Sequence, residues 1–414
     1  MTHDPANGPA RPPEPWHAPR VTGMAVLADG TVIEGVGCGA TGTREAEIVF
    51  NTAITGYQEI LTDPSYAGQV VCFTFPHVGN VGTNDEDMET VPDAPRDKVV
   101  GAIMKAPLGA PSNFRATTDL DAWLKARGII GLTGIDTRAL TAYIRETGSA
   151  NAVIAHDPDG NFDVEDLKRR AADWAGLEGA DLVPGVTSAG LGDWRERSWQ
   201  LGSGYGTNEV DEHHVVAIDY GSKRNILRLF ADLGCRVTIV PADTPADDIL
   251  AMKPNGIFLS NGPGDPAATG EYSVPVIRAL IDADLPVFGI CLGHQMLALA
   301  LGATTMKMHQ GHHGANHPVM DHTTGKVEIV SMNHGFAVDA ETLPQGVEQT
   351  HVSLFDGTNC GIALASRPVF GVQHHPEASP GPQDSHYLFR RFVNLMRERS
   401  GQNALPERGP LETA

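Results

Sequence analysis

Between residues 214 and 301 the sequence alternates short apolar runs with longer amphipathic stretches, and this alternation restricts the fold more than any other feature. The stretch at 223–234 places Ile226, Leu227 and Phe230 on one helical stripe and ends at Gly234. Apolar strands separated by helices of this length predict an α/β fold, with an open, mostly parallel sheet and helices on both faces. Sites in such sheets lie at the carboxyl ends of strands. The expected strands lie in 214–221, 236–242, 256–265 and 286–290.

The first half of the chain also mixes strands and helices, which indicates a separate α/β domain. Its clearest helix is expected over 137–147, where Asp136 stands at the N-cap and Gly148 terminates the helix. A Gly- and Ser-rich stretch without periodicity separates the two halves and predicts a linker. The predicted organisation is a disordered tail at 1–20, an N-terminal domain at 21–190, a linker at 191–213, a second domain at 214–400 and a tail at 401–414.

Charge and cysteine content exclude several classes of function. A net charge of −21 would repel both a nucleic-acid backbone and an anionic membrane, so neither is expected as a partner. No segment approaches the roughly 18 consecutive apolar residues of a membrane span, and the N-terminus lacks the apolar core of a signal peptide. The five cysteines are scattered and form no C-x-x-C pair. We therefore expect a cytoplasmic protein.

The segment "GICLG" (289–293) places Cys291 between two glycines at a strand-to-helix junction. This pattern is typical of a nucleophile elbow in which cysteine replaces serine. At a helix N-terminus the aligned N–H groups favour a thiolate, and the N–H of Leu292 is suited to bind an oxyanion. Gln295 lies one helical turn further on the same face, within reach of whatever Cys291 attacks. The alternative is that Cys291 is a small buried core residue, as most free cysteines are.

A thiolate nucleophile needs a proton acceptor, and "PVFGVQHHPEASP" (368–380) offers one. In an extended chain His375 and Glu377 point to the same side while His374 points away. His375 is then the base and Glu377 orients its ring. A structural histidine beside a surface glutamate is an equally good interpretation of this segment alone. The loop "SNGPGDP" (260–266) carries Gly262 and Gly264, whose backbone N–H groups suit an oxyanion or a polar substrate, or form an ordinary turn.

Together, "SNGPGDP", "GICLGHQ" and "HHPE" resemble the class I (triad) glutamine amidotransferases over residues 214–395. The three motifs follow in the order of that family and at similar spacing. The resemblance implies a glutaminase in which Cys291 attacks the side-chain amide of L-glutamine and His375 moves the proton. Ammonia leaves from a glutamyl thioester that water then hydrolyses.

The first half resembles the small-subunit family of carbamoyl-phosphate synthase, through "FNTAITGYQEILTDPSYAGQVV" (50–71), "PHVGNVGTN" (76–84), "APSNFRA" (110–116) and "GLTGIDTRALT" (131–141). "DYGSKRNILR" (219–228) and "HQGHHGANHPV" (309–319) resemble the same family. The resemblance implies a large synthase subunit as partner, which carries ATP, bicarbonate and Mg, and no cofactor on this chain, which has no P-loop motif. The glutamine-binding residues that it implies are Ser65, Gly262, Gly264, Leu292, Gln295, Asn333, Gly335 and Phe336.

Other interpretations stay open at this point. The histidines of "MHQGHHGANHPVMDH" are dense enough to suggest a metal site, but no Cys or carboxylate completes a recognisable spacing, so none is expected. His334 is a possible second acid–base group or a local structural contact. For function, the alternatives are a free-standing γ-glutamyl amide hydrolase, the glutaminase subunit of another amidotransferase, or a regulatory subunit with an inactive site.

Overall fold

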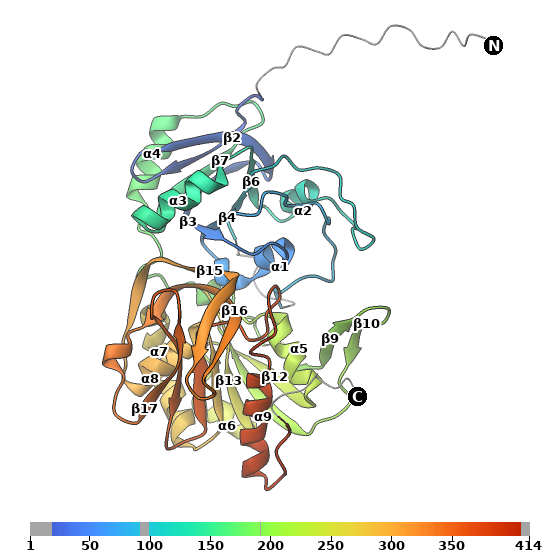
Figure 1. Cartoon of the computed structure of the whole chain (residues 1–414), viewed down its shortest axis with the longest axis vertical. Coiled ribbons are helices and arrows are strands. Elements are labelled where there is room, and N and C mark those ends of the chain that lie inside the picture. The colour runs from blue at the N-terminus through green and yellow to red at the C-terminus, as the bar shows by residue number, and fades with distance from the viewer. Residues whose placement is uncertain (1–18, 92–98, 191, 407–414) are drawn as a thin grey trace, which may run out of the picture.

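The computed structural model describes residues 19–91, 99–190 and 192–406, in two parts that pack on each other (Figure 1). The N-terminal part is a barrel and the C-terminal part is a large sheet with helices. Most of the two predicted disordered tails, residues 1–18 and 407–414, falls outside the described residues. Within the described ranges, no helix combines the length and the apolar character needed to cross a bilayer.

Among the described residues, seven strands close into the barrel in the order β1-β2-β6-β5-β4-β3-β7. Strand β4 is buried along its whole length, and Val70 and Cys72 point into the same apolar core as Ile103 and Leu132. The barrel strands are β1 (Gly23–Leu27), β2 (Val32–Gly39), β3 (Gly42–Asn51), β4 (Gln69–Phe73), β5 (Gly101–Ile103), β6 (Ile130–Thr133) and β7 (Ala150–His156). Its closure was not predicted, because which strands pair is decided by contacts distant in sequence.

The helices that cover the barrel are α1 (Tyr57–Thr62), α2 (Leu120–Ala126), α3 (Thr137–Thr147) and α4 (Val164–Asp173). Helix α3 confirms the predicted capping. The Asp136 side chain accepts a hydrogen bond from the backbone N–H of Ala139 at 3.0 Å, and Gly148 ends the helix with a φ of 92°. A short 3-10 helix, η1 (Pro64–Tyr66), follows α1 and carries Ser65.

In the part of the chain that the structure describes, the C-terminal sheet has ten strands in the order β16-β15-β17-β18-β19-β14-β13-β11-β12-β8. Its centre, β12-β11-β13-β14-β19, is parallel, and the strands on both sides of this centre pair antiparallel. The strands are β8 (Gly192–Trp194), β11 (His213–Asp219), β12 (Cys235–Pro241), β13 (Gly256–Leu259), β14 (Val287–Ile290), β15 (Thr305–Asp321), β16 (Lys326–Val338), β17 (Val347–Ser353), β18 (Asn359–Leu364) and β19 (Val369–Val372). The predicted α/β architecture is confirmed, and antiparallel strands extend the parallel centre on both sides.

Helices cover both faces of the parallel centre, as predicted. Successive residues of β14 face opposite sides: Phe288 packs with α5 and α9, and Val287 packs with α6, α7 and α8. The first core is rich in aromatic rings, and the second is mainly aliphatic. The helices are α5 (Arg224–Asp232), α6 (Ala246–Ala251), α7 (Pro266–Asp282), α8 (Leu292–Leu301) and α9 (Tyr387–Arg399).

The expectation of an irregular linker over 191–213 is wrong for its described part. Strand β8 (Gly192–Trp194) pairs with β12, and β9 (Glu196–Gln200) and β10 (Gly204–Thr207) form a hairpin. Arg228 fastens this hairpin to α5: its guanidinium lies 4.0 Å from the ring centroid of Tyr205 and pairs with Glu196 at 2.9 Å. These tertiary contacts stabilise strands that are too short and glycine-rich to show a periodic pattern.

The two parts meet where β15 and β16 pass beneath the barrel (Figure 1). The backbone N–H of Thr52, which follows β3, bonds to the carbonyl of His313 at 3.3 Å, and Ser149 N–H bonds to His309 at 2.9 Å. On the other side, Thr90 of the barrel domain forms a backbone bridge with Lys223 at the start of α5. This junction carries Ser65 to the carboxyl ends of the parallel strands.

Candidate active site

Cys291 lies on the sharp turn between β14 and α8, with φ 52° and ψ −105°, a conformation that residues with a side chain rarely adopt. The flanking glycines permit the turn. A Cβ on Gly289 would lie 2.6 Å from the carbonyl oxygen of Gly293, and a Cβ on Gly293 would lie 2.1 Å from that of Leu259. The strand–turn–helix geometry expected from the G-x-C-x-G pattern is therefore present, for the steric reason that predicted it.

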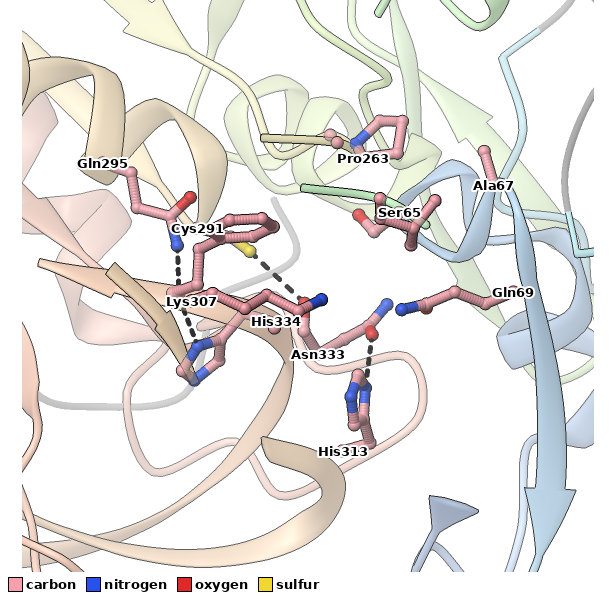
Figure 2. Close-up of a pocket in the computed structure, with 15 residues that line it drawn as sticks. Ser65, Ala67, Gln69, Pro263, Cys291, Gln295, Lys307, His313, Asn333 and His334 are labelled. Carbon is pink, nitrogen blue, oxygen red and sulfur yellow. Dashed lines mark hydrogen bonds between the residues drawn. The ribbon is translucent and has the colours of Figure 1, made fainter. Parts of the chain in front are cut away.

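The thiol of Cys291 faces a narrow cavity, although only 2% of the residue is exposed (Figure 2). Its Sγ donates to the backbone carbonyl of Asn333 at 3.4 Å and accepts from Nε2 of Gln373 at 3.6 Å. The cavity has a volume of about 30 Å³.

His375 and Glu377 lie next to this cysteine and form a hydrogen bond of 2.6 Å between Nδ1 and Oε1. The extended conformation predicted for this segment is wrong, because β19 ends at Val372, His375 forms an isolated bridge with Ser331, and Glu377 lies in a turn. The backbone N–H of His375 bonds to Ser331 at 2.9 Å, which fixes this turn against β16. His374 points away, as predicted, and its ring packs against that of His351.

Burial opposes protonation of the His375 ring, but the carboxylate of Glu377, through its charge and its hydrogen bond, and the nearby thiol of Cys291 outweigh it and raise the pKa of His375 to about 10. The imidazole is therefore held in its cationic form beside the thiol. Its Nε2 is buried without a hydrogen-bond partner in the structure, so it is the ring nitrogen left for proton exchange.

Lys223 is a third charged group beside His375 and Glu377, and its contact with Glu377 was not predicted from the sequence. Its ammonium lies 2.9 Å from Oε1 of Glu377 and donates to the carbonyl of Ala378 at 2.7 Å. Burial alone would raise the pKa of Glu377, but Lys223 and His375 lower it to about 2. The carboxylate therefore stays ionised and can orient His375. Nothing in the lone lysine of "DYGSKRNILR" signals this contact, which forms only in the folded chain.

Seven of the eight predicted glutamine-binding residues line the cavity at Cys291: Ser65, Gly262, Gly264, Gln295, Asn333, Gly335 and Phe336. Leu292 lies beside it, with a side-chain carbon 2.9 Å from where a Cβ of Gly262 would be. Its backbone N–H belongs to the first turn of α8, where N–H groups have no intrahelical acceptor. The cavity therefore brings residues from both parts of the chain around one thiol.

Two of these side chains are held in place by the protein itself. The amide of Asn333 spans His313 and Asp63: its Oδ1 bonds to Nδ1 of His313 at 2.9 Å and its Nδ2 donates to Asp63 at 3.1 Å. Its backbone carbonyl is the part that faces the thiol. The Ser65 hydroxyl accepts from Nδ2 of Asn261 at 2.9 Å, which ties η1 to the loop after β13.

Gln295 is oriented in the same way. Its Nε2 donates to the carbonyl of Phe336 at 2.7 Å and to Oε1 of Gln373 at 2.9 Å. With the nitrogen held on this side, the amide oxygen is directed away from these acceptors, as Figure 2 shows. The predicted position one turn beyond the cysteine is therefore occupied by a fixed polar group.

Lys307 also lines the cavity and was not predicted. Its ammonium pairs with Oε2 of Glu47 at 2.7 Å and lies 4.9 Å from the ring centroid of Phe336. Glu47 belongs to the barrel and also accepts from Gln69 at 3.0 Å. This ion pair joins the two parts of the chain at the cavity, and no local pattern in the sequence could have revealed it.

The histidine-rich segment forms separate local contacts. His312 of this segment bonds to Asp356 at 2.8 Å. His334, which lies outside the segment on β16, bonds through Nδ1 to the carbonyl of Phe336 at 2.8 Å. Burial lowers the pKa of His334 well below its usual value, which favours the local structural interpretation of this residue. In the portion of the chain that the structure describes, no three His, Cys, Asp or Glu side chains are grouped in a way that would hold a metal ion.

Comparison with known proteins adds two family matches and a set of relatives. The model of the class I glutamine amidotransferases matches residues 216–395, and that of the CPSase domain of the carbamoyl-phosphate synthase small chain matches residues 25–154. A carbamoyl phosphate synthase small chain from Rhizobium meliloti is 71% identical over 95% of this chain and 98% of its own length. Those of Brucella anthropi and Brucella ovis are each 68% identical over 95% of this chain and 97% of theirs.

Proposed function

The chain belongs to the family of carbamoyl phosphate synthase small chains, and from that premise we propose that it hydrolyses glutamine with Cys291, His375 and Glu377 and delivers the ammonia to a large synthase subunit. The observation that carries this assignment is the buried series of Lys223, Glu377 and His375, joined by contacts of 2.9 and 2.6 Å, beside a thiol on an elbow. Lys223 keeps Glu377 ionised, and Glu377 keeps His375 protonated.

In this mechanism the thiolate of Cys291 attacks the side-chain carbonyl carbon of glutamine, and the carbonyl oxygen takes up negative charge. The N–H of Leu292, with backbone donors of the loop at Gly262, lies where it can stabilise that oxygen. Protonated His375 gives its proton to the departing nitrogen, so ammonia leaves and a glutamyl thioester remains. His375 then accepts a proton from water, the hydroxide adds to the thioester, and glutamate and the thiol are released.

The remaining residues of the cavity bind the amino-acid end of the substrate. The ammonium of Lys307 suits an α-carboxylate, and the fixed amide oxygen of Gln295 suits an α-ammonium group.

Free ammonia in water at neutral pH is mostly protonated and no longer nucleophilic, so its release is productive only beside an enzyme that consumes it. The proposed partner is the large subunit, which supplies the sites for ATP, bicarbonate and Mg. All five cysteines lie in the described part of the chain and are free thiols, which favours a reducing compartment and supports a cytoplasmic location.

The test compares two nitrogen donors in the reconstituted complex. Cys291→Ser should abolish carbamoyl phosphate formation from glutamine and leave formation from ammonium salts unchanged. Cys38→Ser, at a half-buried thiol of the barrel, is the matched control and should retain both activities. Loss of both activities in Cys291→Ser would contradict the division of labour. Full glutaminase activity of the isolated chain without any synthase partner would favour a free-standing amide hydrolase.

A further inference from the structure

We infer that Glu89, a buried carboxylate of the barrel domain, is a positioning residue that holds Glu377 in place for the reaction. The inference rests on the proposed function, because it assumes that Glu377 orients His375. Glu89 touches neither the cavity at Cys291 nor any group that reacts. It acts through two neighbours of Glu377, Asn225 and Ser379.

Glu89 is itself rigidly held, with 1% of its surface exposed. Its backbone N–H donates to the Thr62 hydroxyl at 3.0 Å, and its carbonyl accepts from the N–H of Arg224 at 2.9 Å. Its side chain accepts from the N–H of Asn225 at 3.0 Å through one oxygen and from the Ser379 hydroxyl through the other. The carboxylate of one domain is thus bound to two separate segments of the other.

Both of these segments lead directly to Glu377. The side chain of Asn225 donates to the backbone carbonyl of Glu377 at 2.7 Å, so Glu89 and Glu377 are joined through a single residue. Ser379 follows Glu377 by two positions, and both Ala378 and Ser379 have a φ of 57°, which residues with a side chain rarely adopt. The contacts with Glu89 and with the ammonium of Lys223 hold this unusual backbone in place.

The charge of Lys223 gives a second reason for a carboxylate at position 89. The buried ammonium of Lys223 is faced by the carboxylates of Glu377, Glu89 and Asp63, the last two contributed by the barrel domain. Burying a carboxylate is unfavourable unless it is paired and hydrogen-bonded, and burial indeed raises the pKa of Glu89 while Lys223 and Arg228 oppose the rise. An apolar side chain would fill the space at lower cost but would bind neither Asn225 nor Ser379.

Glu89 also borders a cavity of about 570 Å³, which reaches Asn225 and Ser379. Truncation to alanine therefore leaves a space that a small solute can enter. This makes chemical rescue possible: formate carries the missing carboxylate and no side chain, so it can restore the two hydrogen bonds without restoring the packing.

The test uses the complex with the large subunit and measures glutaminase kcat and KM. Glu89→Ala should lower kcat by about 10- to 100-fold, because displacement of a catalytic group by about 1 Å has effects of this size, while KM for glutamine changes less than about 3-fold. Synthesis from ammonium salts should be unchanged. Glu86→Ala is the matched control, since Glu86 lies in the same loop, is partly exposed and pairs with Arg115 instead.

Formate should restore a large part of kcat in Glu89→Ala and have no effect on Glu86→Ala. A kcat of Glu89→Ala within about twofold of wild type would overturn the inference. A loss of kcat that formate does not restore at all would also overturn it, because the loss would then come from packing. If Glu89→Ala does not assemble, the equal-volume Glu89→Gln is judged by the same kcat criterion. Cys291→Ser is measured in parallel. If Cys291→Ser keeps its glutaminase activity, the proposed function fails. If Cys291→Ser is inactive and Glu89→Ala keeps its glutaminase activity, only the inference about Glu89 fails.

Discussion

Gly293→Ala tests the steric argument for the elbow, since a methyl group is the smallest group that the turn should reject. The added Cβ would lie 2.1 Å from the carbonyl oxygen of Leu259, and 3.0 Å is the closest that real Cβ contacts come, so about 0.9 Å of movement is required. The obstacle is backbone at the end of β13, in the centre of the sheet, and cannot rotate away. Overpacking of this kind costs about 1–3 kcal/mol, and we expect the upper end.

Gly270→Ala is the matched control, because Gly270 lies buried in α7, the helix that packs against α8, and a Cβ there would meet nothing closer than 3.4 Å. Alanine is favoured over glycine in a helix by about 1 kcal/mol, so this variant should be neutral or more stable. For a domain of this size 1 kcal/mol shifts Tm by roughly 2–4 °C, which predicts a fall of about 6–12 °C for Gly293→Ala and a rise of a few degrees at most for Gly270→Ala.

Differential scanning calorimetry of the two variants and the wild type measures the difference, with glutaminase activity recorded on the same samples. Gly293→Ala should also lose about 100-fold in activity, because the shift of 0.9 Å falls on the residues beside the nucleophile. If Gly293→Ala melts within 2 °C of wild type and keeps its activity, the turn tolerates a side chain and the steric reason for the G-x-C-x-G pattern is wrong.

Three further predictions concern the charged groups of the site. Glu377→Ala should reduce glutaminase kcat less than His375→Ala does, and equal losses would mean that Glu377 does more than orient the ring. Because the pKa of His375 is raised from 6.5 to about 10, its ion pair with Glu377 contributes its full stabilisation below pH 6.5 and loses it as the pH rises through 10. The Tm difference between wild type and His375→Gln should therefore shrink over that range. A Tm difference that stays constant would contradict the assignment. Lys307→Met should raise KM for glutamine by about 10-fold or more with little change in kcat, since a hydrogen bond to a charged group is worth about 1.5–3 kcal/mol; an unchanged KM would exclude Lys307 from substrate binding.

The parts of the site that the sequence predicted are those whose geometry is local. The elbow at Cys291 follows from two glycines and one strand–helix junction, and helix α3 follows from Asp136 and Gly148 at its ends. His375 and Glu377 were paired correctly, but on the assumption of a strand that ends at Val372 instead. Side chains two positions apart in sequence can contact each other in several backbone conformations. The pairing of His375 with Glu377 could therefore be predicted correctly from an incorrect secondary structure.

The residues that the sequence did not reveal act across the junction of the two domains. Glu47 and Glu89 come from the barrel, whereas their partners Lys307 and Asn225 come from the sheet domain, more than a hundred positions away. No periodicity or spacing encodes such pairs, because each depends on how two complete domains pack. The strands at 192–207 were missed for the same reason, since contacts such as that of Arg228 with Tyr205 stabilise them.

The distribution of charge across the junction explains why the two domains belong to one chain. The sheet domain supplies the thiol, the imidazole, Glu377 and the lysine that keeps Glu377 ionised. The barrel supplies Ser65 at the cavity, Asp63 against Asn333, and Glu89 against the segments that hold Glu377. Either domain alone would therefore lack partners for its polar groups at the junction and would expose them to water. The sheet domain alone contains the triad, but the groups that fix the position of Glu377 and complete the cavity lie on the barrel.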